Sequence, residues 1–133
     1  AVCWPAQPIS DEAEAVWHAA APGRLDIVGG DTQLAMLAGL NAYDKPSIFT
    51  DLDTRFAPWI TRQRLREHGM LMVWPGRGVP PQLRVWLGNL PVKTVLFNWS
   101  RTAPPVPISF AAIPPGTRYL SLDADSRTRH PRS

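Results

Sequence analysis

The stretch LDIVGGDTQLAMLAGL, residues 25–40, decides the fold of this chain. Its first four residues, Leu25–Val28, are mostly apolar and include two β-branched side chains, which is typical of a short buried strand. A glycine pair ends this strand, and Asp31 or Thr32 then caps a helix that continues to about Leu40. A strand that passes through a tight turn into a helix is the repeating unit of α/β folds.

The rest of the chain repeats this alternation of strands and helices. Further strands are predicted at Pro46–Thr50, Met70–Trp74, Val92–Phe97 and Pro107–Ile113, with a short edge strand at Arg118–Leu122. One helix is predicted from Ser10, which serves as an N-cap and is followed by two acids, to Ala21. A second is predicted from Thr61 to His68, with Gly69 at its C-terminal end. A third is predicted from Pro80 to Leu87. We therefore expect a small layered α/β domain, Rossmann-like or flavodoxin-like, with a mainly parallel sheet of about five strands and helices on its faces.

The length of 133 residues suits one domain. We assign residues 1–125 to a single α/β domain and residues 126–133, which lack apolar side chains, to a disordered basic tail. The apolar runs are far shorter than the roughly 20 residues that a membrane helix needs, and no secretory signal is present. Because the first residue is alanine, we expect an excised piece of a longer protein.

Charge is distributed unevenly along the chain. Residues 1–60 hold three basic and eight acidic side chains, whereas residues 61–133 hold eleven basic and three acidic ones. No nucleic-acid motif accompanies the basic side chains, so we expect no nucleic-acid partner. Attraction to anionic lipid headgroups and a merely solvated basic surface both remain open as explanations.

The sequence offers few groups for cofactors or metals. The glycine turn lacks the third glycine of a dinucleotide-binding turn, and Asp31 places a negative charge where a phosphate would sit, so we expect a cap and no cofactor. The single cysteine, Cys3, excludes zinc sites built on cysteine pairs. Because His18, His68 and His130 show no metal-ligand spacing, we expect no metal site.

Several polar and aromatic residues follow strands and are candidates for a binding site. Asp51 and Asp53 alternate after the second predicted strand, so their carboxylates point the same way, as in Asp-x-Asp sugar transferases that bind a divalent cation. Carboxylates of a surface loop are the simpler interpretation. With Gly30, Asp31 and Trp59, they can converge at one edge of the sheet, where acids and an indole suit a hydroxyl-rich ligand. These five residues are our candidate substrate-binding site.

Three passages, taken in order, resemble a known family. They are DIVGGDTQLA at 26–35 with YDKPSIF at 43–49, APWI at 57–60 with GMLMVWP at 69–75, and ISFAAIPP at 108–115. Their order and spacing resemble the C-terminal soluble domain of bacterial membrane glycosyltransferases of the family 39 type, relatives of the protein mannosyltransferases and lipid A sugar transferases. The resemblance covers residues 12–116.

The resemblance implies that the chemistry lies outside this chain. In that family a multi-helix membrane domain transfers sugar from a polyprenyl-phosphate donor, with an aspartate of an early loop as base, so we expect no catalytic residue here. It implies an extracytoplasmic accessory domain at the periplasmic side of the bacterial inner membrane. Such a domain would dock on its own membrane domain, cover the active site or help to bind the acceptor sugar.

Two other functions stay open. The chain is alternatively a structural or protein-interaction module, or an independent metal-dependent sugar transferase that uses Asp51 and Asp53. Whether the chain alone is an enzyme is left undecided by its sequence.

Overall fold

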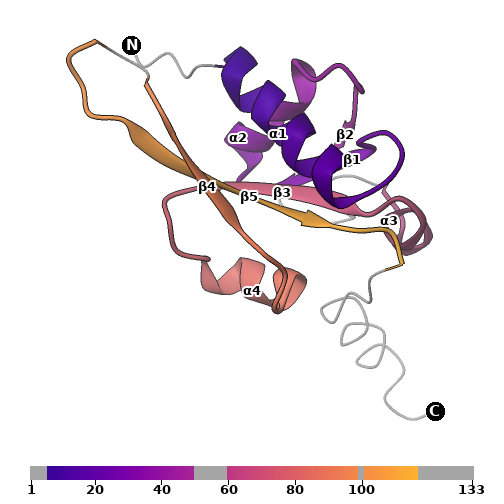
Figure 1. Ribbon diagram of the computed structural model, residues 1–133. Coiled ribbons are helices and arrows are strands. Elements are labelled where there is room, and N and C mark those ends of the chain that lie inside the picture. Colours follow the sequence, from indigo (N-terminus) through magenta and orange to yellow (C-terminus); the bar gives the residue numbers. More distant parts are fainter. Residues whose placement is uncertain (1–5, 50–59, 99–100, 117–133) are drawn as a thin grey trace.

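A computed structural model describes residues 6–49, 60–98 and 101–116 (Figure 1). These residues form one open sheet with the strand order β2-β1-β3-β5-β4. The strands are β1 (Ile27–Gly30), β2 (Ser47–Ile48), β3 (Met70–Pro75), β4 (Lys93–Phe97) and β5 (Val106–Ile113). The helices are α1 (Ala6–Ala20), α2 (Thr32–Leu40), α3 (Arg62–His68) and α4 (Pro81–Leu87).

The sheet is mixed, which corrects the prediction of a mainly parallel one. β1 is parallel to both β2 and β3, whereas β5 is antiparallel to its two neighbours, β3 and β4. The reason lies in the connections, because parallel neighbours need a crossover, while β4 and β5 are joined without a helix and therefore turn back on each other. The α/β class with helices on both faces is confirmed.

The sheet separates two apolar cores. Figure 1 shows α1 and α2 on one face and α4 on the other. Side chains alternate along a strand, so Leu71 and Val73 of β3 pack with α1 and α2, while Met72 and Trp74 pack with α3 and α4. None of these four side chains is more than 1% exposed, which confirms β3 as a strand buried on both faces.

The start of α1 differs from the prediction. The helix begins at Ala6, so Ser10 is not its N-cap, and the acids that follow Ser10 lie outside the first turn. Ser10 is fully buried, and its Oγ donates to the carbonyl oxygen of Ala38 in α2 at 2.6 Å. The apolar face of α1 includes Ile9, which packs in the core, so the helix begins before Ser10.

The predicted helix signals at α2 and α3 are confirmed. Asp31 Oδ1 accepts the N–H of Leu34 at 3.0 Å, and Thr61 Oγ1 accepts the N–H of Arg64 at 3.0 Å. Gly69 follows α3 with a φ of 74°. The predicted edge strand at 118–122 and the predicted tail at 126–133 lie outside the described residues.

Candidate functional site

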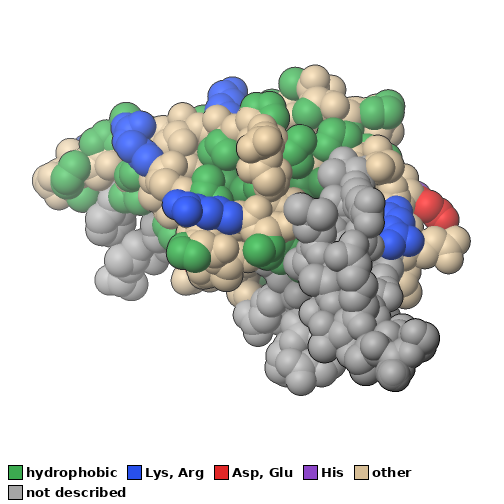
Figure 2. Space-filling view, turned by 90° about the horizontal axis from the view of Figure 1, so that it is seen from below, with side chains coloured by type: hydrophobic (Ala, Val, Ile, Leu, Met, Phe, Trp, Pro, Cys, Tyr) green, Lys and Arg blue, Asp and Glu red, His purple; other side chains and the backbone are tan. Residues whose placement is uncertain are grey.

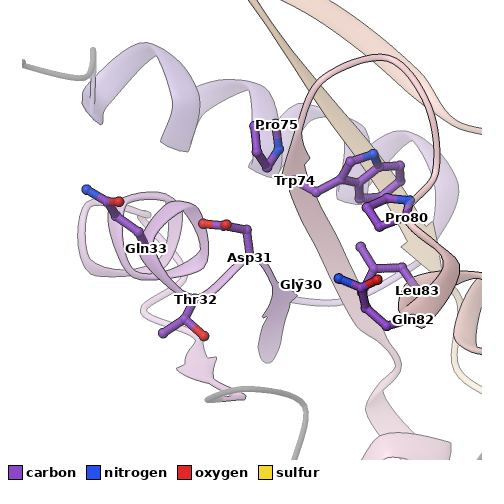
Figure 3. Close-up of a pocket in the computed structure, with 9 residues that line it drawn as sticks. All are labelled: Gly30, Asp31, Thr32, Gln33, Trp74, Pro75, Pro80, Gln82 and Leu83. Carbon is purple, nitrogen blue, oxygen red and sulfur yellow. The ribbon is translucent and has the colours of Figure 1, made fainter.

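A cavity of about 530 Å³ opens at the carboxyl ends of β1 and β3 (Figure 3). From β1 the chain enters α2 on one face of the sheet, and from β3 it continues to α4 on the opposite face. Connections that leave two adjacent parallel strands in opposite directions open a crevice between them. The cavity is lined by Gly30, Asp31, Thr32, Gln33, Trp74, Pro75, Pro80, Gln82 and Leu83.

Gly30 sets the geometry of the crevice. Its φ is +107°, and a Cβ at this position would overlap the carbonyl oxygen of Val73 in β3. The next N–H, that of Asp31, donates to the same carbonyl oxygen at 2.8 Å. Glycine therefore lets the ends of β1 and β3 approach closely, and this approach places Asp31 at the rim.

Asp31 supplies a carboxylate at this rim. The carboxylate caps α2 through the N–H of Leu34, and no lysine or arginine among the described side chains forms an ion pair with it. Since a carboxylate only accepts hydrogen bonds, this group suits a ligand that donates them.

The opposite wall comes from β3 and α4. In Figure 3, Gln82 and Trp74 stand on one side of Gly30, and Asp31 and Gln33 stand on the other. The Trp74 indole is only 1% exposed, and its Nε1 donates to the carbonyl oxygen of Gly78 at 2.8 Å, so the ring is held in place. Gln33 and Gln82 are exposed, and their carboxamides offer both donors and acceptors.

Two of the five predicted site residues line this cavity, Gly30 and Asp31. The other three, Asp51, Asp53 and Trp59, lie outside the described residues. The prediction missed Trp74, which the sequence pattern assigns to the core, and the two glutamines. The signal that could have indicated Trp74 is its position at the carboxyl end of β3. Because β3 is parallel to β1, the carboxyl ends of both strands lie at the same edge of the sheet.

A different polar group lies at the amino end of β1. Arg64 donates from Nε to Asp26 Oδ2 at 2.7 Å and from a terminal guanidinium nitrogen to Ser47 Oγ at 2.8 Å. The hydrogen bond from Arg64 lowers the pKa of Asp26, against the effect of burial, and the charges of Arg64, His68 and Arg24 lower it further. This group ties α3 to β1 and β2.

Comparisons of the chain with protein-family models, with curated proteins and with solved structures give no match. The resemblance to membrane glycosyltransferases therefore stays a prediction. Within residues 6–49, 60–98 and 101–116, no helix has both the length and the apolar character needed to cross a bilayer.

Proposed function

We propose that this chain is a carbohydrate-binding accessory domain whose cavity between β1 and β3 holds a sugar. The polar lining of that cavity carries the proposal, since it combines the Asp31 carboxylate with the exposed carboxamides of Gln33 and Gln82, beside a Trp74 side chain that is itself buried. A carboxylate accepts hydrogen bonds from sugar hydroxyls, and carboxamides both donate and accept them, so these three groups suit a hydroxyl-rich ligand. A volume of about 530 Å³ suits a mono- or disaccharide.

The site favours a neutral sugar over a phosphorylated one. A helix N-terminus attracts phosphate through its free N–H groups and its dipole. At α2, however, the Asp31 carboxylate already accepts the N–H of Leu34 and adds a negative charge. The ligand is therefore better matched to an acceptor sugar than to a phosphate-bearing donor.

The sequence resemblance extends this proposal to a parent enzyme. The chain would be an extracytoplasmic part of a membrane-bound glycosyltransferase at the periplasmic side of the bacterial inner membrane. Its own membrane domain would carry the catalytic groups and use the polyprenyl-phosphate donor, and this domain would help to bind the acceptor. A crevice between adjacent parallel strands, as in Rossmann-like and flavodoxin-like folds, is compatible with that binding role.

The lower face of the molecule is compatible with a nearby anionic membrane. Figure 2 shows Lys and Arg side chains spread between hydrophobic ones on this face, while the visible acidic atoms gather at one end. On α4, Arg84 is exposed and Val85 is 50% exposed. Each basic side chain close to anionic headgroups adds about 1 kcal/mol of attraction.

The sugar proposal is tested by titrating the purified chain with mono- and oligosaccharides, followed by calorimetry and tryptophan fluorescence. Asp31→Asn is the main variant, because asparagine caps helices as well as aspartate does and so removes only the charge. We expect saturable binding that weakens about tenfold in Asp31→Asn and in Gln82→Ala. Gln63→Ala, which changes an exposed glutamine on α3, serves as the control and binds like the wild type.

Two outcomes would contradict the proposal. One is the absence of saturable binding for every sugar tried. The other is binding that Asp31→Asn and Gln82→Ala leave unchanged, because the ligand would then occupy a different surface.

A protein-interaction module is a second candidate, favoured by the outer face of α2. Met36 and Leu40 lie one helical turn apart and are 46% and 66% exposed, and Tyr43 just beyond the helix is 91% exposed. An apolar row of this kind on a short helix is typical of a contact surface. Leu40→Asp would disrupt such a contact and leave sugar binding intact, which separates the two functions.

The third candidate function, an independent metal-dependent sugar transferase, depends on Asp51 and Asp53. Both residues lie outside the described residues.

A further inference from the structure

A three-residue polar cluster lies at the amino end of β1, opposite the end that borders the cavity. Glu14 and His18 stand one turn apart on α1, and Asp44 belongs to the connection between α2 and β2. One ligand-type atom from each side chain lies within 4.8 Å of the other two. The presence of an imidazole nitrogen distinguishes this group from an ordinary acidic surface cluster.

The spacing of these atoms matches a metal site. His18 Nε2 is 2.9 Å from Asp44 Oδ2 and 3.5 Å from Glu14 Oε1. Zinc binds imidazole nitrogen and carboxylate oxygen at about 2.0–2.2 Å, which puts neighbouring ligands of a tetrahedral site about 3.4 Å apart. Glu14 Oε1 therefore already stands at this separation from the imidazole nitrogen, while Asp44 Oδ2 would move about half an ångström away from it.

Backbone hydrogen bonds already orient the two carboxylates. Asp44 Oδ2 accepts the N–H of Leu25 at 2.7 Å, and Glu14 Oε2 accepts the N–H of Asp44 at 2.7 Å. The second bond leaves Glu14 Oε1 as the oxygen nearer the imidazole. Outer hydrogen bonds of this kind fix metal ligands in place before the ion arrives.

The charge and the exposure of the cluster also favour a bound cation. The side chains of Glu14 and Asp44 are only 15% and 12% exposed, and no lysine or arginine among the described side chains pairs with either. Arg24, close by in the sequence, donates instead to the carbonyl oxygen of Lys45 and faces Asp26. His18, at 47% exposed, leaves the cluster open to solvent on one side.

We propose that Glu14, His18 and Asp44 bind a divalent transition-metal ion, zinc in preference to magnesium or calcium, because imidazole favours the former. Three protein ligands leave a fourth position for water. The ion takes the place of the hydrogen bond between His18 and Asp44 and holds α1 against the connection between α2 and β2. This site is independent of the sugar proposal, since no residue is shared with the cavity.

The experiment is calorimetric titration of the purified 133-residue chain with zinc chloride, with magnesium chloride as comparison. We expect one zinc per chain, no comparable magnesium binding, and a higher melting temperature with zinc. His18→Ala should weaken zinc binding at least about tenfold. Asp44→Asn should weaken it too, while its amide oxygen still accepts the N–H of Leu25. His68→Ala, at an exposed histidine outside the cluster, should bind like the wild type.

Three results would overturn the proposal. One is the absence of saturable zinc binding. Another is binding that His18→Ala and Asp44→Asn leave unchanged. The third is binding that survives in His18→Ala but is lost in Cys3→Ser, which would assign the ion to the single thiol of the chain.

Discussion

Two aspartates flank β1, and their surroundings differ. Asp26, just before the strand, is 8% exposed and bonds to the guanidinium of Arg64 at 2.7 Å. Asp31, just after the strand, accepts the backbone N–H of Leu34 and borders the cavity. A carboxylate neutralised by an internal cation contributes to stability, whereas one beside a cavity is available to a ligand. The same residue type therefore serves the fold at one end of β1 and the candidate site at the other.

Removing the partner of Asp26 should give the largest effect. Arg64→Met leaves the buried carboxylate of Asp26 without its hydrogen-bonded cation, with only the more exposed Arg24 at 3.6 Å, and should lower the free energy of unfolding by about 2–3 kcal/mol at neutral pH. Arg77→Met, in the exposed loop after β3, is the matched control and should change it by less than about 0.5 kcal/mol. Urea denaturation measures both values. An equal decrease in the free energy of unfolding in the two variants would mean that the Asp26–Arg64 pair does not stabilise the fold.

The pH dependence of stability tests the same pair. The folded-state pKa of Asp26 lies below the ordinary value of 3.8. Asp26 therefore contributes stability that is complete above pH 3.8 and is lost as the pH falls through the folded-state pKa. Asp26→Asn should therefore cost more at neutral pH than at a pH below the folded-state pKa of Asp26, where the wild type has lost the same contribution. A cost that stays constant across this range would show that the charge of Asp26 does not contribute.

The smallest effects are expected at Asp31. Asp31→Ala removes the cap of α2 and should cost about 1 kcal/mol, whereas Asp31→Asn keeps a capping oxygen and should cost less than about 0.5 kcal/mol. The comparison is made by urea denaturation without ligand. If asparagine costs as much as alanine, the charge of Asp31 stabilises the fold, and the contrast with Asp26 disappears.

The sequence predicts those elements whose signals are local. β3 shows as an apolar run, and α2 and α3 show through capping side chains that the structure confirms. The placement of Ser10 could not be predicted, because its partner is a carbonyl oxygen 28 residues away. The position of β5 between β3 and β4 depends on pairing with β3, which is likewise a non-local choice.

The candidate site was predictable on one side only. Gly30 and Asp31 belong to a strand-to-helix turn that the sequence shows directly. Trp74 and Gln82 reach the same cavity from β3 and α4, and only the order of strands in the sheet brings them there. The cluster of Glu14, His18 and Asp44, for which we propose a metal, could not be predicted for the same reason, since Asp44 lies 26 residues beyond His18.

The position of β5 has a consequence for how the protein is made. β5 is the last strand of the described chain, yet it lies between β3 and β4. Until residues 106–113 have emerged from the ribosome, β4 has no partner among the other described strands, and β3 pairs with β1 alone. The described sheet therefore cannot close before this segment appears, and a chain cut before Val106 would leave β4 joined to the rest chiefly through its contacts with α1.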